Sequence, residues 1–190
     1  MGLMRTIPEV TLLEPTDSVM LADLMRQTKD MYGVFYIRIT RKVVDKVFED
    51  GSTFEIGKAV ELRDGSDVTL ITSGYCTTDT IKAAEILAKE GISAKVLNMF
   101  TWKPLDEQLI LDSAAECGAI VTAENHQVKV GLGSAVANVV IKNNPVPMEM
   151  VGVEDRFGQV GAESFLREEY GLTAAHIVEA AKKAIARKNG

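Results

Sequence analysis

Residues 67–98 decide the fold and read DVTLITSGYCTTDTIKAAEILAKEGISAKVLN. Asp67–Thr72 is a continuous apolar run, which is typical of a strand covered on both faces of a sheet. Apolar residues recur at helical spacing from Thr77 to Lys89, and Gly91 follows as a helix C-cap. Ala94–Asn98 is a second short strand. Strand, helix and strand at these lengths predict a βαβ unit with parallel strands.

The same alternation continues to the C-terminus. We expect strands at 119–123 and 148–153, and helices from Pro104 to Gly118, over 133–141, and from a Thr173 cap to Arg187. On the N-terminal side, Lys58–Leu62 alternates and leads into an Asp-Gly turn, which predicts an antiparallel edge strand joined to Asp67–Thr72. Residues 54–190 therefore predict a three-layer α/β domain with a mixed, mainly parallel sheet of about five strands.

Residues 1–41 predict a smaller unit in front of this domain. Val10–Glu14 and Val34–Ile39 have strand character, and Thr16 or Asp17 caps a helix that runs to about Asp30. A single βαβ unit is too small to fold alone, so we expect the C-terminal remnant of a larger domain. Residues 42–53 are charged and lack a period, and we interpret them as a linker.

Composition excludes several classes of partner. Hydrophobic residues make up 46% of the 190 residues and the net charge is −6, without a basic run. We therefore expect a packed core and neither nucleic acid nor membrane as a partner, because no apolar stretch approaches the roughly 20 residues that a bilayer requires. Cys76 and Cys117 lack metal-binding spacing, and we interpret them as reduced thiols of a cytoplasmic protein.

Polar residues gather where the predicted strands end, which is where open α/β sheets bind ligands. These segments are Ser73–Cys76, Asn98, Glu124–His126 and Glu154–Asp155. Gly131-Leu132-Gly133-Ser134 then starts a helix. Two interpretations stay open for this turn: a phosphate cradle at a helix N-terminus, or tight packing against a neighbouring strand or chain.

Glu124 and His126 are two residues apart at a strand end, so they share a face. They are candidates for an acid/base pair, and the alternative is a hydrogen-bonded structural or interface histidine. The scattered histidines and cysteines offer no metal site, and the chain has no Gly-x-Ser-x-Gly nucleophile elbow. These residues alone do not choose a function.

The order of several segments resembles the C-terminal section of transketolases. Residues 3–10, 14–17 and 36–41 (LMRTIPEV, EPTD and YIRITR) are similar to the end of the pyrimidine-binding domain. Six further segments are similar to the C-terminal domain of transketolases: 54–59 (FEIGKA), 103–106 (KPLD), 124–126 (ENH), 131–134 (GLGS), 157–158 (FG) and 170–173 (YGLT). The chain looks closest to C-terminal subunits of split bacterial and archaeal transketolases.

This resemblance implies transfer of a two-carbon ketol unit between sugar phosphates, as in the pentose phosphate pathway, with thiamine diphosphate and Mg²⁺ in the complete enzyme. No catalytic residue is expected in this chain, because the pyrimidine-activating acid and the diphosphate site lie elsewhere in the family. By resemblance, Arg41 binds the substrate phosphate; the alternative is a surface arginine, and Arg38 is interpreted as part of a structural ion pair.

The resemblance also implies partners. We expect a homodimer formed through the C-terminal domain, and an N-terminal transketolase subunit as a further partner, with this chain inactive and free of cofactor when alone. Three alternatives stay open: a dimerisation module without catalysis, a fragment of deoxyxylulose-phosphate synthase, and a fragment of a 2-oxo-acid dehydrogenase beta subunit.

Overall fold

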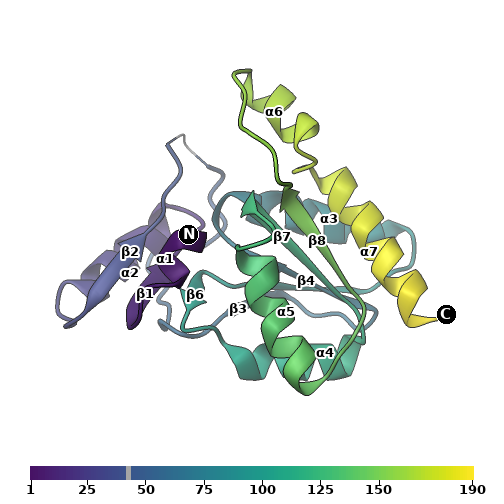
Figure 1. Ribbon diagram of the computed structural model, residues 1–190, viewed down its shortest axis with the longest axis horizontal. Helices are drawn as coiled ribbons and strands as arrows, with labels where there is room; N and C mark the ends of the chain where they lie inside the picture. The colour runs from purple at the N-terminus through teal and green to yellow at the C-terminus, as the bar shows by residue number, and fades with distance from the viewer. Residues whose placement is uncertain (42–43) are drawn as a thin grey trace.

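The larger of two sheets forms the centre of the molecule (Figure 1). The computed structural model describes residues 1–41 and 44–190. The strands of this sheet are β3 (Val60–Arg63), β4 (Val68–Thr72), β5 (Ala94–Asn98), β7 (Ile120–Gln127) and β8 (Met148–Val153), in the spatial order β3-β5-β4-β7-β8. All pairs are parallel except β3 with β5. The predicted mixed, mainly parallel α/β fold is confirmed.

The predicted pairing of the first strand was wrong. Strand β3 is an antiparallel edge, as expected, but it pairs with β5 and not with β4, to which the Asp-Gly turn leads. The reason is that β4 lies between β5 and β7 and has no free edge to offer. A short Asp-Gly connection therefore does not make a hairpin here.

Two pairs of helices cover the two faces of this sheet (Figure 1). Helices α3 (Thr77–Lys89) and α7 (Ala174–Lys188) pack on Val68, Leu70, Val96 and Val121. Helices α4 (Glu107–Cys117) and α5 (Leu132–Asn143) pack on Ile71, Leu97 and Ile120 on the opposite face. Alternate residues of each strand point to opposite faces, so Leu70 and Ile71 belong to different cores. This is the predicted three-layer arrangement.

The N-terminal part builds a second, smaller sheet together with a strand from the middle of the chain. It contains α1 (Gly2–Arg5), β1 (Val10–Leu13), α2 (Ser18–Thr28) and β2 (Val34–Ile37). Strand β1 pairs in parallel with β2 and antiparallel with β6 (Thr101–Lys103). Residues 1–41 thus share a sheet with the C-terminal part, and the division at residue 54 stays a prediction.

The stretch that was interpreted as a linker lies partly outside the described residues, at positions 42–43. Farther along, the backbone N–H groups of Val47 and Phe48 donate to Asp17 Oδ2 at 2.8 and 2.9 Å. Asp17 also caps α2, because its Oδ1 accepts from Met20 N at 3.0 Å. The Asp17 carboxylate therefore caps α2 and also holds the backbone at Val47 and Phe48 against the start of that helix.

Several local elements differ from the prediction. Helix α4 begins at Glu107 rather than near Pro104, because Asp106 is its N-cap and accepts from Leu109 N. The sequence patterns also missed α1, β6, the 3₁₀ turn η1 (Gly74–Cys76) and α6 (Glu163–Glu169). Each helix in the described part of the chain is too short or too polar to span a bilayer. Both cysteines are free and buried.

The shared sheet predicts that the two parts unfold together. Leu12 in β1 is fully buried in the core that contains Ile71 and Trp102. Leu12→Ala should lower the free energy of unfolding by about 2–5 kcal/mol. Urea unfolding should show one transition, detected alike by far-UV circular dichroism and by fluorescence of Trp102. Leu3→Ala is the control, because Leu3 is 87% exposed; two separate transitions would contradict the prediction.

Candidate functional site

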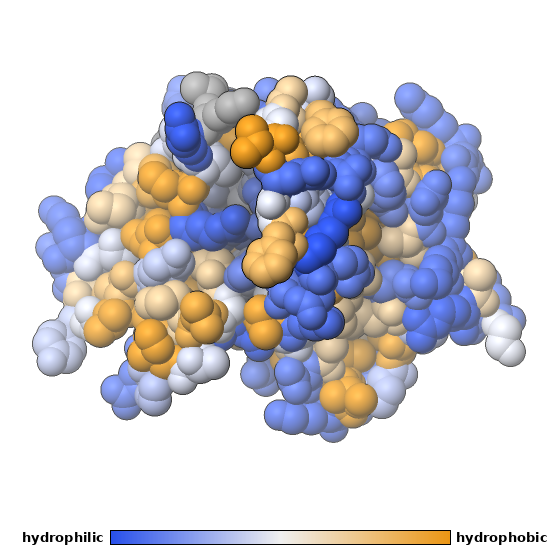
Figure 2. Space-filling model, turned by 45° about the horizontal axis from the view of Figure 1, so that its top comes forward, coloured by the Kyte–Doolittle hydropathy of each residue, from blue (hydrophilic) through white to orange (hydrophobic). Residues whose placement is uncertain are grey.

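A cleft of about 570 Å³ lies where the two parts of the molecule meet. One wall consists of the end of β1 and the residues after β2, namely Glu14, Pro15 and residues 38–41. The other wall contains Tyr75, Asn125, Val153 and several residues of the segment 158–172. Figure 2 shows the molecule from this side, with hydrophilic and hydrophobic residues interleaved. Of the residues that the structure describes, three arginines line the cleft: Arg38, Arg41 and Arg167.

Arg38 is held in the first wall by a buried carboxylate. Its Nη1 donates to Glu14 Oε1, and the Glu14 side chain is 5% exposed. The other carboxylate oxygen accepts from Ser73 Oγ at 2.5 Å, and Ser73 accepts from Trp102 Nε1 at 2.9 Å. The predicted ion pair of Arg38 is thus present. The sequence analysis did not include Glu14 among the site residues.

Arg41 lies in the same wall but is exposed to solvent. Among the described residues it makes none of the hydrogen bonds or ion pairs that engage Arg38 and Arg167. A guanidinium in this position presents five N–H donors with the planar geometry that phosphate oxygens require. Its location is compatible with the role that the resemblance implied, and the role itself stays a prediction.

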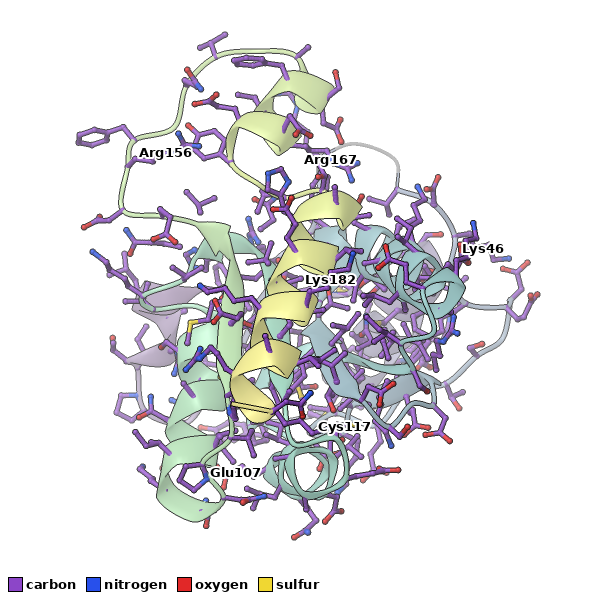
Figure 3. The ribbon with its side chains drawn as sticks, turned by 90° about the vertical axis from the view of Figure 1, so that its right-hand side faces the viewer. Lys46, Glu107, Cys117, Arg156, Arg167 and Lys182 are labelled. Atoms are coloured by element: carbon purple, nitrogen blue, oxygen red, sulfur yellow. The ribbon has the colours of Figure 1, made fainter. Side chains whose placement is uncertain are left out.

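The second wall is fastened to the domain through α6. Arg167 forms an ion pair with Asp79 of α3, and its guanidinium carbon lies 5.5 Å from the centre of the Tyr75 ring. Tyr75 Oη in turn donates to Glu163 Oε1 at 2.5 Å. Burial and this hydrogen bond raise the pKa of Tyr75 above its usual range, so the hydroxyl keeps its proton. Figure 3 shows Arg167 on the side of α6 that faces the rest of the molecule.

The residues singled out after β7 form a separate cluster around the start of α5. Glu124 is fully buried, and its two carboxylate oxygens accept from the backbone N–H groups of Leu132 and Gly133, both at 2.7 Å. A Cβ on Gly131 would lie 1.7 Å from Glu124 Oε2. The chain's own carboxylate thus occupies the helix N-terminus that an external phosphate would need. Of the two open interpretations, this geometry favours tight packing.

Helix α1 closes over this cluster. Arg5 Nη1 donates to the carbonyl oxygens of Val130 and Gly131 at 2.7 and 2.8 Å, and to Ser134 Oγ at 3.1 Å. Burial raises the pKa of Glu124 to about 7, against the lowering effect of the two backbone N–H groups. The cluster therefore ties the first turn of the chain to the start of α5.

His126 belongs to the same cluster but does not hydrogen-bond to Glu124 among the described contacts. Its Nε2 lies 2.8 Å from Gly2 N and its Nδ1 lies 2.8 Å from Gln127 N, and the ring stacks on Trp102. A protonated ring would point an N–H at both backbone donors. Burial, followed by the positive N-terminus, Arg38 and Arg5, lowers the pKa of His126 to about 4. The imidazole is therefore neutral at pH 7.

Sequence reasoning singled out this cluster and Arg41 as candidates, but it named few of the other residues that line the cleft. Tyr75 was inside a segment expected at a strand end, and Tyr170 begins the 170–173 segment of the resemblance, but neither was named as a site residue. Arg167 lies in no segment that the sequence analysis singled out. Asn98, also expected at a strand end, is fully buried and donates to Thr16 Oγ1 at 2.6 Å. It joins the two parts of the fold rather than lining the cleft.

Comparison with known proteins gives consistent results. The protein family described as Transketolase, C-terminal domain matches residues 57–177. The 6-deoxy-6-sulfo-D-fructose transketolase subunit SqwH of Clostridium sp. (strain MSTE9) is 45% identical over 99% of this chain. A putative transketolase C-terminal section of Methanocaldococcus jannaschii is 36% identical over 96% of it. The chain spans 58% and 59% of the lengths of these two relatives.

A solved structure is similar over nearly the whole chain. This structure, a split gene transketolase described as an inactive beta4 tetramer, has a TM-score of 0.96 and 40% sequence identity. The similarity covers 98% of this chain and 61% of that one. The transketolase from Leishmania mexicana, at 18% identity and a TM-score of 0.77, shares the fold.

The neutral state of His126 predicts a pH dependence of stability. Its pKa is lower in the folded protein than the usual 6.5, so its contribution is present above about pH 6.5 and is lost as pH falls toward 4. His126→Phe keeps a ring against Trp102 but cannot be protonated. Between pH 7 and pH 5, the melting temperature of wild type should therefore fall more than that of the variant.

Glu124 acts in the opposite direction, because its pKa is raised, but it does so in both proteins. Its effect cancels in the difference between them. Parallel melting temperatures for wild type and His126→Phe across this pH range would show that His126 is not the group responsible.

Proposed function

This chain belongs to the transketolase family and carries its C-terminal domain, and from this premise we propose that it is the C-terminal subunit of a split transketolase. The observation that carries the proposal is the 45% identity to a transketolase subunit over 99% of the chain. The cleft with the exposed Arg41 supports it further, because it offers a place for an anionic sugar at the boundary of the two parts.

The proposed reaction moves a two-carbon ketol unit from one sugar phosphate to another. In this reaction the chain binds and orients the substrate. Arg41 would hold the terminal phosphate by charge-assisted hydrogen bonds, while the body of the sugar lies along the cleft. Fixing the distant anionic end places the reacting carbon, which lowers the entropic cost of reaching the transition state.

Thiamine diphosphate would supply the carbanion chemistry when it is bound to the complete enzyme. The described residues bring together no three histidine, cysteine, aspartate or glutamate side chains that could hold a metal ion. The residues present in the cleft therefore do not fit the magnesium diphosphate end of the cofactor. We place that end in the complementary subunit and assign no catalytic residue to this chain.

The proposed complex contains an N-terminal subunit and two or more copies of this chain. The relative SqwH is named as a subunit, and the structurally similar chain is described as a beta4 tetramer. We propose association of two copies through the C-terminal domain, in the cytoplasm, where the buried thiols of Cys76 and Cys117 stay reduced.

A sugar sulfonate is a second candidate for the substrate. The SqwH relative is named for 6-deoxy-6-sulfo-D-fructose, whose sulfonate presents three oxygens to an arginine as a phosphate does. A 1-deoxy-D-xylulose-5-phosphate synthase of Heliobacterium modesticaldum is also 36% identical, over 95% of the chain. A role in assembly without catalysis is the alternative function, and it is not enzymatic. The structurally similar split gene transketolase is described as an inactive tetramer, which is a reason to test this alternative.

Removing the proposed anion contact should lower kcat/KM for phosphorylated acceptors and leave that for unphosphorylated acceptors nearly unchanged. Arg41→Ala, measured in the complex with the N-terminal subunit, should weaken kcat/KM for phosphorylated acceptors about ten- to a hundredfold, because a charge-assisted hydrogen bond is worth roughly 1.5–3 kcal/mol. Unphosphorylated acceptors should be little affected. Arg63→Ala, which removes an exposed arginine outside the cleft, is the control. Equal losses on both acceptor types would remove Arg41 from the anion site.

The chain alone should have no transketolase activity and should bind thiamine diphosphate weakly or not at all. The groups that would hold the diphosphate and activate the pyrimidine are proposed to lie in the complementary subunit. Titration calorimetry with thiamine diphosphate and Mg²⁺ tests this, and activity should appear only on addition of the N-terminal subunit. A dissociation constant in the low micromolar range for the chain alone would contradict this division of roles.

A further inference from the structure

Arg38 is anchored at the cleft wall through the carboxylate of Glu14. Its carboxylate partner, Glu14, is fixed on both oxygens, by Arg38 itself and by Ser73 Oγ. Trp102 Nε1 donates to Ser73 Oγ, and the serine hydroxyl donates its own proton to Glu14, because an ionised carboxylate can only accept. The orientation of the carboxylate is therefore set from inside the core and is independent of solvent.

The backbone around Glu14 adds to this rigidity. Glu14 N donates to Phe100 O at 2.7 Å, and Arg38 N donates to Leu13 O at 2.8 Å. Gly74 has a φ of +47°, and a Cβ there would lie 2.6 Å from Glu14 Cγ. The side chain of Glu14 thus fills the space that a residue other than glycine would occupy at position 74.

The Arg38 side chain reaches from this anchor into the cleft. It is 31% exposed and lines the same wall as Arg41, three residues farther along the chain. One of its nitrogens, Nη1, is engaged by Glu14, and a guanidinium has further N–H donors on its other nitrogens. Replacing a buried ion pair by apolar residues is often neutral or stabilising, so neutralising Glu14 does not by itself account for an arginine at position 38. The pair lies at the wall of an open cleft, where Arg38 can contact a ligand.

We propose that Glu14 is a positioning residue, which holds the Arg38 guanidinium at the cleft wall so that Arg38 and Arg41 together bind the terminal oxyanion of the substrate. The proposal rests on the proposed function and deepens it, since it turns one anion contact into a two-arginine site. A phosphate or sulfonate group has three terminal oxygens, enough for both guanidinium groups to donate at once.

The test uses the complex with the N-terminal subunit and compares glyceraldehyde 3-phosphate with glyceraldehyde as the acceptor. Glu14→Gln keeps the shape of the side chain but removes its charge. It should raise KM for the phosphorylated acceptor about tenfold, as expected for a partly lost charge-assisted hydrogen bond. Both kcat and the KM for glyceraldehyde should stay within about twofold. Ser73→Ala removes only the second anchor of the carboxylate and should act in the same direction, less strongly.

Asp23→Asn is the matched control. Asp23 is also buried, pairs with Arg26 and accepts from Phe54 N at 2.9 Å, but it does not line the cleft. It should lower the melting temperature without changing the ratio of the two KM values. A purely structural role for Glu14 would make Glu14→Gln behave like Asp23→Asn, and that result overturns the proposal. If Glu14→Gln fails to fold, an unchanged KM ratio in Ser73→Ala overturns it equally.

A binding measurement separates this inference from the proposed function. Inorganic phosphate is titrated into the wild-type complex, and the arginine Nε–H signals are followed by NMR. Shifts of both the Arg38 and Arg41 signals, with the Arg38 shift lost in Glu14→Gln, support the two-arginine site even if no ketol transfer is found. A shift of Arg41 alone in the wild type overturns it while leaving the proposed function intact.

Discussion

A buried carboxylate at the end of β1 determines how the two sheets of this protein meet. Burying an ionised carboxyl group is costly unless every oxygen is paired. Glu14 obtains its partners from both sheets, because Ser73 follows β4 of the larger sheet, whereas Arg38 follows β2 of the smaller one. The hydrogen bonds of Glu14 to Ser73 and Arg38 therefore fix the distance between the ends of the two sheets. The cleft lies at that junction, with Glu14 itself in its wall.

Much of the larger sheet could be predicted because its elements are defined by local patterns. The strand Ala94–Asn98 and the helix Thr77–Lys89 have the predicted bounds, since apolar runs and helical spacing leave little ambiguity over such lengths. The strand Thr101–Lys103 was not predictable in this way. It has three residues and forms only because β1 pairs with it, which is a tertiary interaction that no local pattern encodes.

The residues of the candidate site also fall into two groups: those that local patterns indicate, and those that only the tertiary structure brings together. Glu124, His126 and the glycines of 131–134 stand close together in the sequence, so their association could be inferred from spacing, although not the geometry that joins them. Glu14 and Arg38 are 24 residues apart, and Arg167 pairs with Asp79 across 88 residues. Such pairs depend on the whole topology. A single sequence suggested an ion pair for Arg38 but did not identify Glu14 as its partner, and it gave no sign of the pair between Arg167 and Asp79.

The two clusters also differ in how completely they are satisfied, and this difference decides where a ligand can bind. Around α5, the Glu124 carboxylate already accepts from the backbone N–H groups of Leu132 and Gly133, so these donors at the start of the helix are not available to an external anion. In the cleft, Arg38 is fixed at Nη1 while the exposed Arg41 has no such partner among the described residues. Affinity for an anion requires donors that are oriented but not already used. The glycine-rich turn therefore stabilises the fold, and the arginine wall is where the substrate should be sought.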